Sequence, residues 1–395
     1  MLLAHKIALD PNAAQRLYFA RAAGTARFAY NWALKEWRRQ YQAGGKPSDA
    51  SLRRELNSIK RERFPWMFDV TKTAPQEAII DLGMAFRAFF EKRGKYPRPK
   101  RKENRPSFCA DCDKRCLRTN GKRIKLPMIG WVKMREEVRF SGPLKRATIS
   151  CEAGRWFVSL IIETDDVKPV MQPETIVGVD LGVSALATLS TGEVIKGPKA
   201  HKVALKRQRR ANKALSRKRR GSHNFRKAKA RLQRVHRRIA AIRRDATHKL
   251  TTQLARTYKI IGIEDLNVRG MASNPRLARS IMDGGFHEFR RQLIYKAALY
   301  GARVVIADRW YPSSKTCSCC GVVKETLALS QREFKCDDCG FEAPRDVNAA
   351  LNLARLAASS AVSACGEPRS GASRKARVKR GSVKQEEKTA VLEAA

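Results

Sequence analysis

The chain has 395 residues, with 82 lysines and arginines against 37 aspartates and glutamates and a formal net charge of +45. A chain of this length buries cores of its own without disulfides, and its excess of cations indicates a polyanion, most simply nucleic acid, as partner. It contains no run of about 18 apolar residues and no signal-peptide pattern, so we expect an intracellular protein. The ten cysteines are therefore expected to be metal ligands or buried thiols.

The N-terminal region predicts one strand followed by helices. Residues 3–9 alternate as in a strand, and Asp10 and Pro11 provide an N-cap and a first-turn proline for the helical region that follows. Apolar residues between 17 and 37 indicate two helices, and a further pair is expected at about 48–60 and 75–92. Aromatic residues at helical spacing are interpreted as core.

A strand-rich region follows at about 107–164, after a basic, proline-rich link. Residues 149–163 predict a hairpin with Ala153 and Gly154 near its turn. We expect the first strand of the chain to pair with this region. The result would be a small barrel, discontinuous in sequence, that is wrapped around the helical insert.

From residue 174 the pattern predicts a three-stranded meander, followed by a strongly basic segment. Residues 199–249 contain 21 lysines and arginines and one acid, Asp245. Apolar residues at alternating steps of three and four form a seam on this helix, so one face packs and the others are free to contact phosphate. The alternative is a solvated charged helix. We assign nucleic-acid contacts to Arg207, Arg210, Arg217, Arg220, Arg226, Arg234 and Arg238.

Three carboxylates occupy unusual positions in the second half of the chain. Asp180 lies on the first strand of the meander, Glu264 ends a later buried strand, and Asp346 opens the last helix. Acids within apolar strands are costly unless cations neutralise them. Asp265 follows Glu264 directly, and neighbours in a strand point to opposite faces, so we assign only Glu264 to the same site as Asp180.

This order of strands, helices and acids is similar to the RNase H and RuvC arrangement. Such a cluster holds two hard divalent cations about 4 Å apart for in-line attack on a phosphodiester. Two Mg2+ or Mn2+ ions are therefore expected at Asp180, Glu264 and Asp346.

Four cysteines form the most specific motif in the chain. Two CxxC pairs, each followed by glycine, place four thiolates around one ion, and these soft ligands select zinc. With four protein ligands no coordination position stays open, so the zinc is structural. The ligands are Cys317, Cys320, Cys336 and Cys339.

A second cysteine group is one ligand short. It comprises Cys109, Cys112 and Cys116, and the nearest remaining cysteine is Cys151. A second zinc would form if Cys151 folded close to the others; the alternative is a set of free thiols.

With these motifs in order, the chain resembles the TnpB family of insertion-sequence nucleases and, more distantly, the compact type V CRISPR effectors. The matching segments span about residues 5–356 and include RFAYNWAL, LPMIGWVKMR, GVDLGV, IEDLNVRGM, DRWYPSSKTCSCCG, FKCDDCG and RDVNAALNLA. The group from Cys109 to Cys116 departs from the usual pattern.

The resemblance implies an α/β multidomain protein with an RNase H-like (RuvC) mixed sheet, a zinc ribbon insert, a small wedge β-barrel and an N-terminal helical recognition lobe. The expected domains are the wedge at 1–10 and 94–172, recognition helices at 11–93, a first nuclease part at 173–310 with a basic insert at 199–255, a zinc ribbon at 311–343, a second nuclease part at 344–358 and a disordered tail at 359–395.

The resemblance also implies an RNA-guided DNA endonuclease that is associated with a transposable element and cuts beside a short adjacent motif. Its partners would be a guide RNA and double-stranded target DNA, with one chain per guide and no membrane. It would be cytoplasmic in a bacterium and nucleoid-associated through DNA. Lys72 and Gln76, one helical turn apart, resemble the pair that reads the motif, although the start of a solvent-exposed helix has the same pattern.

Three alternatives remain open: a compact type V CRISPR effector, an RNA-guided DNA-binding regulator that does not cleave, and a strand-transferring transposase. All three acids are present, which argues against the regulator. The residues scarcely separate the first alternative from TnpB.

Overall fold

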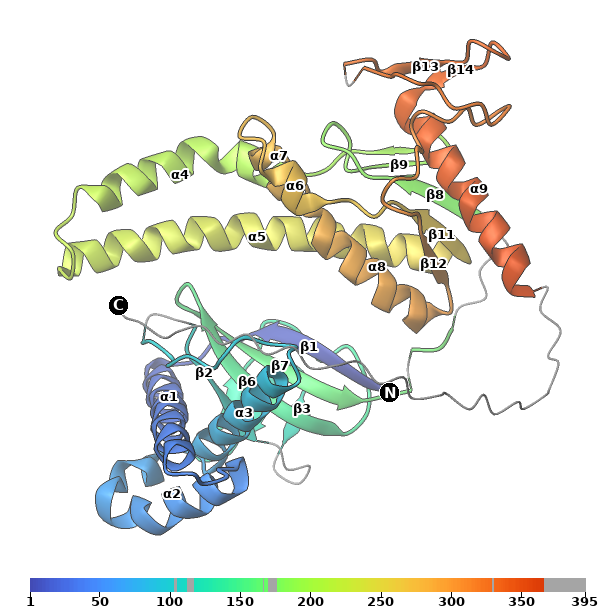
Figure 1. Ribbon diagram of the computed structural model, residues 1–395. Coiled ribbons are helices and arrows are strands. Elements are labelled where there is room, and N and C mark those ends of the chain that lie inside the picture. Colours follow the sequence, from blue (N-terminus) through green and yellow to red (C-terminus); the bar gives the residue numbers. More distant parts are fainter. Residues whose placement is uncertain (103–104, 112–116, 166, 170–175, 329, 366–395) are drawn as a thin grey trace, which may run out of the picture.

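The computed structural model describes residues 1–102, 105–111, 117–165, 167–169, 176–328 and 330–365. Figure 1 shows two groups of elements, which we call the N-terminal half (residues 1–165) and the C-terminal half (residues 176–365). Each half contains a large hydrophobic core of its own.

The N-terminal half contains two antiparallel sheets. The larger has the order β1 (Leu2–Ala8), β7 (Arg155–Glu163), β6 (Leu144–Glu152) and β2 (Ser107–Asp111). The smaller is formed by β3 (Arg118–Asn120), β4 (Arg123–Leu126) and β5 (Gly130–Lys133). The expected pairing of the first strand with the hairpin is confirmed, since β1 runs antiparallel to β7. Within the described residues an isolated bridge between Leu9 and Met134 links the two sheets, and a closed barrel stays a prediction.

Of the helices inserted after β1, the first and third pack against β2 of the larger sheet. The inserted elements are α1 (Ala13–Gln42), α2 (Asp49–Arg63), a 3-10 turn (Pro65–Asp69) and α3 (Thr73–Phe90). The expectation of two helices before residue 42 was wrong, because α1 continues through Gly24 and has no internal proline to break it. Trp37 stacks on Phe86 with ring centroids 4.2 Å apart, as expected for core aromatics.

The C-terminal half is built on a five-stranded mixed sheet. Its order is β10 (Val194–Ile195), β9 (Ala187–Leu189), β8 (Ile176–Asp180), β11 (Ile260–Ile263) and β12 (Arg303–Ile306). The first three strands form the expected antiparallel meander, whereas β11 runs parallel to β8 and β12 parallel to β11. The central strands β8 and β11 have apolar sequences and are largely buried, as is usual for parallel strands covered on both faces.

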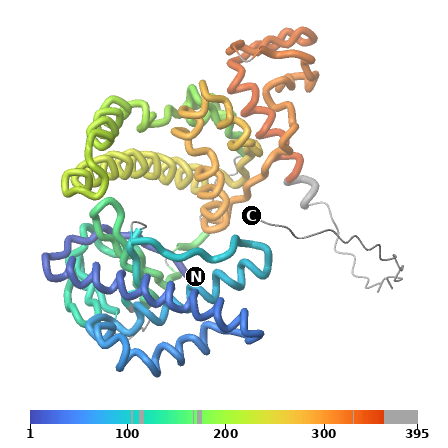
Figure 2. Tube along the Cα trace, turned by 60° about the vertical axis from the view of Figure 1, so that its left-hand side comes forward, coloured from blue at the N-terminus to red at the C-terminus, as the bar shows by residue number. Residues whose placement is uncertain are grey.

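The basic segment folds into two helices, α4 (Ala200–Ser216) and α5 (His223–Thr257), which lie side by side. Figure 2 also shows α5 between α4 and the N-terminal half. The expected seam packs only in part: Val235 and Ile239 form a small core with Ala200, but Ile242 is 39% exposed. Most lysines and arginines of α4 and α5 are exposed.

Further helices cover the sheet. They are α6 (Val268–Ala272), α7 (Ala278–Gly284), α8 (Phe286–Tyr300) and α9 (Arg345–Cys365). A small hairpin of β13 (Glu333–Lys335) and β14 (Glu342–Pro344) leads into the start of α9. Helix α9 extends past residue 358, where the tail was expected to begin, and the rest of that tail lies outside the described residues. Among the described helices, none is both long and apolar enough to cross a membrane.

Candidate active site and metal centre

The sheet brings Asp180 and Glu264 to one edge. Asp180 is the last residue of β8, and Glu264 directly follows β11. These strands are parallel neighbours in which Val179 lies opposite Ile263, so the two acids leave the same end of the sheet at the same level.

Two glycines bring α9, and with it Asp346, to that edge. Gly178 in β8 lies opposite Gly262 in β11. A Cβ at residue 178 would lie 1.8 Å from the carbonyl oxygen of Ala350, and one at residue 262 would lie 2.3 Å from that of Leu353. The backbone of α9 therefore rests directly on the two strands, which is possible only because both residues lack side chains.

Burial perturbs Asp180 and Glu264, and repulsion by other acids adds to the effect at Asp180. Burial, followed by the charges of Glu264 and Asp346, raises the pKa of Asp180 to about 8, although Arg345 opposes the shift. Burial also raises the pKa of Glu264, while a hydrogen bond from Ser313 and the charge of Arg345 lower it. Carboxylates that destabilise each other in this way form a donor set that suits hard divalent cations.

Glu264 and Asp265 are neighbours in the chain, but their carboxylates lie in different environments. The hydroxyl of Ser313 donates a hydrogen bond to the Glu264 carboxylate. Asp265 instead pairs with Arg290 and, at 2.8 Å, with Arg309. Glu264 and Asp346 thus act on Asp180 through their charges, whereas Asp265 is paired with arginines.

Two asparagines that we did not single out connect α9 to the cysteine-containing segment. Asn348 and Asn352 are buried. The Asn348 side chain accepts from the backbone N–H of Ser318 at 2.9 Å, and the Asn352 amide donates to the carbonyl of Ser313 at 2.8 Å. Their four-residue spacing in RDVNAALNL was the available signal, because it places both on one face of a helix. They link the cysteine segment to the carboxylate edge.

The four cysteines of the two CxxC pairs converge. One sulfur atom from each of Cys317, Cys320, Cys336 and Cys339 lies within 4.8 Å of the others, the one such group among the described residues. The Sγ–Sγ distance is 3.7 Å for Cys317 and Cys339 and 3.6 Å for Cys320 and Cys336.

The cysteine thiols influence one another. Burial raises the pKa of Cys317, but backbone N–H groups of Cys320 and Cys319 bring it down to about 7. The N–H of Phe341 lowers the pKa of Cys339, but burial and the other cysteines raise it to about 12. Four crowded sulfurs cannot all be thiolates without a cation, and their number and type suit zinc.

The second cysteine group does not form a comparable centre among the described residues. Cys109 lies in β2 and is buried, whereas Cys151 lies in β6 and is half-buried. Cys112 and Cys116 lie outside the described residues, so a second zinc stays a prediction.

The residues predicted to contact nucleic acid are exposed. Lys72 immediately precedes α3, and Gln76 lies in its first turn. A groove between α4 and α5 is lined by Arg207, Arg234 and Arg238 from the predicted set, but its lining does not include Arg210, Arg217, Arg220 or Arg226. Three of the seven predicted arginines therefore line this groove, and the other four do not.

Three family models match the chain: "Probable transposase" over residues 159–274, "Cas12f1-like, TNB domain" over 286–353, and "Helix-turn-helix domain" over 1–46. A "Putative RNA-guided DNA endonuclease" of Streptomyces pristinaespiralis is 40% identical over 97% of this chain and 96% of its own. A "Putative RNA-guided DNA endonuclease InsQ" of Escherichia coli K12 is 34% identical over 93% and 94%.

A solved structure shows a similar fold. The cryo-EM structure of a Cas12f1–sgRNA–target DNA complex contains a chain with a TM-score of 0.56 and 14% identity, covering 86% of this chain and 83% of that one. At that identity the similarity concerns the fold alone.

Proposed function

Because this chain belongs to the TnpB family of RNA-guided DNA endonucleases, we propose that it cleaves guide-matched DNA by metal-dependent phosphodiester hydrolysis beside a short adjacent motif. The observation that supports the proposal best is the convergence of three acids from β8, β11 and α9 at one edge of an RNase H-like sheet. Membership of this family also implies an association with a transposable element.

Asp180, Glu264 and Asp346 would hold two divalent cations. Those ions, when bound, supply the positive charge that the attacking and leaving oxygens of a phosphodiester need. The fit is supported by the electrostatics of Asp180, whose pKa is raised to about 8 by burial and by the two other acids. Cations that relieve this repulsion would keep all three side chains ionised as ligands.

The chain itself orients these ligands. The Ser313 hydroxyl donates to Glu264 and holds the carboxylate in one rotamer. Arg345, next to Asp346, favours the ionised forms of Asp180 and Glu264. The cysteine cluster would hold one structural zinc and so keep the segment that carries Ser313 in place.

The partners of this function are a guide RNA and double-stranded DNA. The two basic helices would contact phosphates, and Lys72 and Gln76 would read the adjacent motif from the start of α3. Under this proposal the N-terminal half comprises the wedge and the recognition helices, and the C-terminal half comprises the nuclease and the zinc ribbon. One chain would act with one guide.

The test uses two acids with opposite expected outcomes. The full chain is purified with the RNA that it binds when it is expressed from its native locus, that RNA is sequenced, and matched DNA is supplied with and without Mg2+. Asp180→Ala should abolish cleavage and leave DNA binding near normal. Asp265→Asn is the matched control and should still cut, because Asp265 pairs with Arg290 and Arg309 away from the other acids.

Unchanged cutting by Asp180→Ala would remove the metal-site assignment. If the wild-type protein bound matched DNA but left it intact in Mg2+, the outcome would support a non-cleaving regulator instead. Joining of element ends by a dimer would support a transposase.

A further inference from the structure

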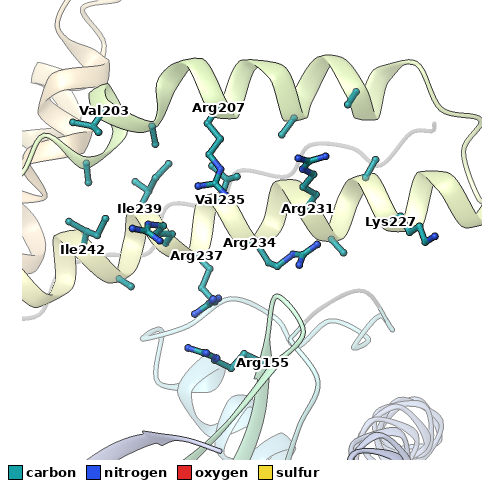
Figure 3. A pocket seen from close by; sticks show the side chains of 18 of the residues that line it. Arg155, Val203, Arg207, Lys227, Arg231, Arg234, Val235, Arg237, Ile239 and Ile242 are labelled. Atoms are coloured by element: carbon teal, nitrogen blue, oxygen red, sulfur yellow. The ribbon is translucent and has the colours of Figure 1, made fainter. Parts of the chain in front are cut away.

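A large groove runs between α4 and α5 and reaches the tip of the β6–β7 hairpin. Its volume is about 1490 Å3, and the described residues that line it include eight lysines and arginines but no acid. Figure 3 shows Arg207 of α4 and Arg231 of α5 projecting into the space between the helices, with apolar side chains such as Val235 beside them. A groove lined by cations and small apolar side chains suits a strand of nucleic acid, which has charged phosphates and less polar sugars and bases.

The hairpin turn fixes one arginine at the mouth of this groove. Glu152 lies opposite Arg155 across the two-residue turn. The turn residues, Ala153 and Gly154, have φ values of 50° and 78°, as in the tight turns that match strand twist. Arg155 is therefore carried on a short, well-defined turn and not on a long loop.

Arg237 of α5 faces Arg155 from the other half of the molecule. Figure 3 shows the two side chains pointing toward each other. The Nε atom of Arg237 is buried and has no hydrogen-bond partner in the part of the chain that the structure describes. Burial and then the charge of Arg155 lower the pKa of Arg237, and the charge of Glu152 opposes them only in part. Two guanidinium groups that face each other repel, and an anion placed between them would relieve this repulsion.

The nearby acid, Glu152, acts on Arg237 but is shared with other cations. Glu152 is engaged by Lys6 and, at 3.4 Å, by Arg105. Its carboxylate also feels the charge of Arg244. The junction between the two halves thus contains several cations around a single acid.

We propose that Arg155 and Arg237 together grip one phosphodiester of a nucleic-acid strand in this groove, so that the bound backbone bridges the β6–β7 hairpin and α5. The inference rests on the proposed function only in that the ligand is nucleic acid. Neither arginine was among the residues predicted from the sequence. Because RNA and DNA share this phosphate chemistry, the test compares both.

Binding of the full chain, stripped of nucleic acid, is measured by fluorescence anisotropy. The probes are a labelled single-stranded RNA, a single-stranded DNA of the same sequence and an RNA–DNA hybrid, each at several salt concentrations. Arg155→Gln and Arg237→Gln should each weaken binding roughly tenfold and reduce the salt slope by about 0.7 to 0.9. The double variant should lose little more than either single variant, because both arginines hold the same phosphate.

The matched control is Arg61→Gln, which removes the same charge from an exposed position on α2, outside the groove. Equal effects of Arg61→Gln and Arg155→Gln would overturn the proposal, since net charge alone would then explain them. Loss with RNA and hybrid only would identify the guide strand as the ligand, and loss with DNA and hybrid only would identify the target strand.

Arg155→Glu separates a ligand-binding role from a structural one. It places an anion opposite Arg237, so binding should weaken more than in Arg155→Gln while the melting temperature without nucleic acid stays the same or rises. A lower melting temperature with unchanged binding would refute the clamp. These readouts do not involve cleavage, so a failure of the clamp is distinguishable from a failure of the nuclease proposal.

Discussion

Replacing Gly178 by alanine tests whether the contact between α9 and the sheet assembles the carboxylate site. The new Cβ would lie 1.8 Å from the Ala350 carbonyl oxygen and 2.6 Å from the Ala354 nitrogen. An ordinary carbon–oxygen contact is about 3.3 Å, so α9 must retreat by roughly 1.5 Å. Both nearby atoms belong to backbone, and no side-chain rotation can relieve the overlap.

The retreat should affect both stability and cleavage. Overpacking of this kind costs up to about 3 kcal/mol, which corresponds to a melting temperature lower by roughly 6–12 °C for a folded unit of this size. Asp346 moves with the helix, and a misplacement of about 1 Å in a reacting site lowers the rate by about 100-fold. Thermal melting and cleavage of matched DNA in Mg2+ measure the two effects.

Gly24→Ala is the control, because a Cβ at this position in α1 would meet nothing within 4 Å. Alanine is favoured over glycine in a helix by about 1 kcal/mol, so this variant should cut normally and melt at or slightly above the wild-type temperature. Gly262→Ala should behave like Gly178→Ala. If Gly178→Ala melted and cut like Gly24→Ala, the close contact between α9 and the sheet would not position the site.

Three further predictions concern other parts of the C-terminal half. Ser313→Ala should slow cleavage about tenfold through loss of a hydrogen bond to an ionised group and leave binding of guide and target unchanged; an unaffected rate would exclude a positioning role. Cys336→Ser should remove the single zinc per chain found by elemental analysis and lower cleavage, and retention of zinc would contradict the four-cysteine site. Burial lowers the pKa of Lys296 to about 8, below its unfolded value of about 10.4, so the folded state disfavours the cation and the wild type should gain stability relative to Lys296→Met as pH rises from about 8 to 10. Melting curves at several pH values that show a constant difference would refute this last prediction.

The candidate site could be located from the sequence because its chemistry is local. A charged carboxylate inside an apolar strand, as at Asp180, costs free energy unless a cation neutralises it. The paired CxxC motifs specify four sulfur atoms, and the structure shows that these sulfurs converge. The meander and the pairing of β1 with β7 also followed from periodicity and turn residues. The roles of these acids and cysteines remain predictions.

Other features depended on contacts between distant segments. The single helix α1 differs from the expected pair because no proline interrupts its sequence and its buried residues continue on both sides of Gly24. The meeting of Arg155 with Arg237 has no signature in either segment.

The sequence by itself determined which residues carry charge, sulfur and apolar surface, because each of these is a property of a residue and its near neighbours. Only the tertiary structure decided which of them meet. Gly178 and Gly262 lie far apart in sequence, and their importance arises from a third segment, α9, that rests on both. Such close packing depends on the shapes of all three segments at once, which no local pattern contains.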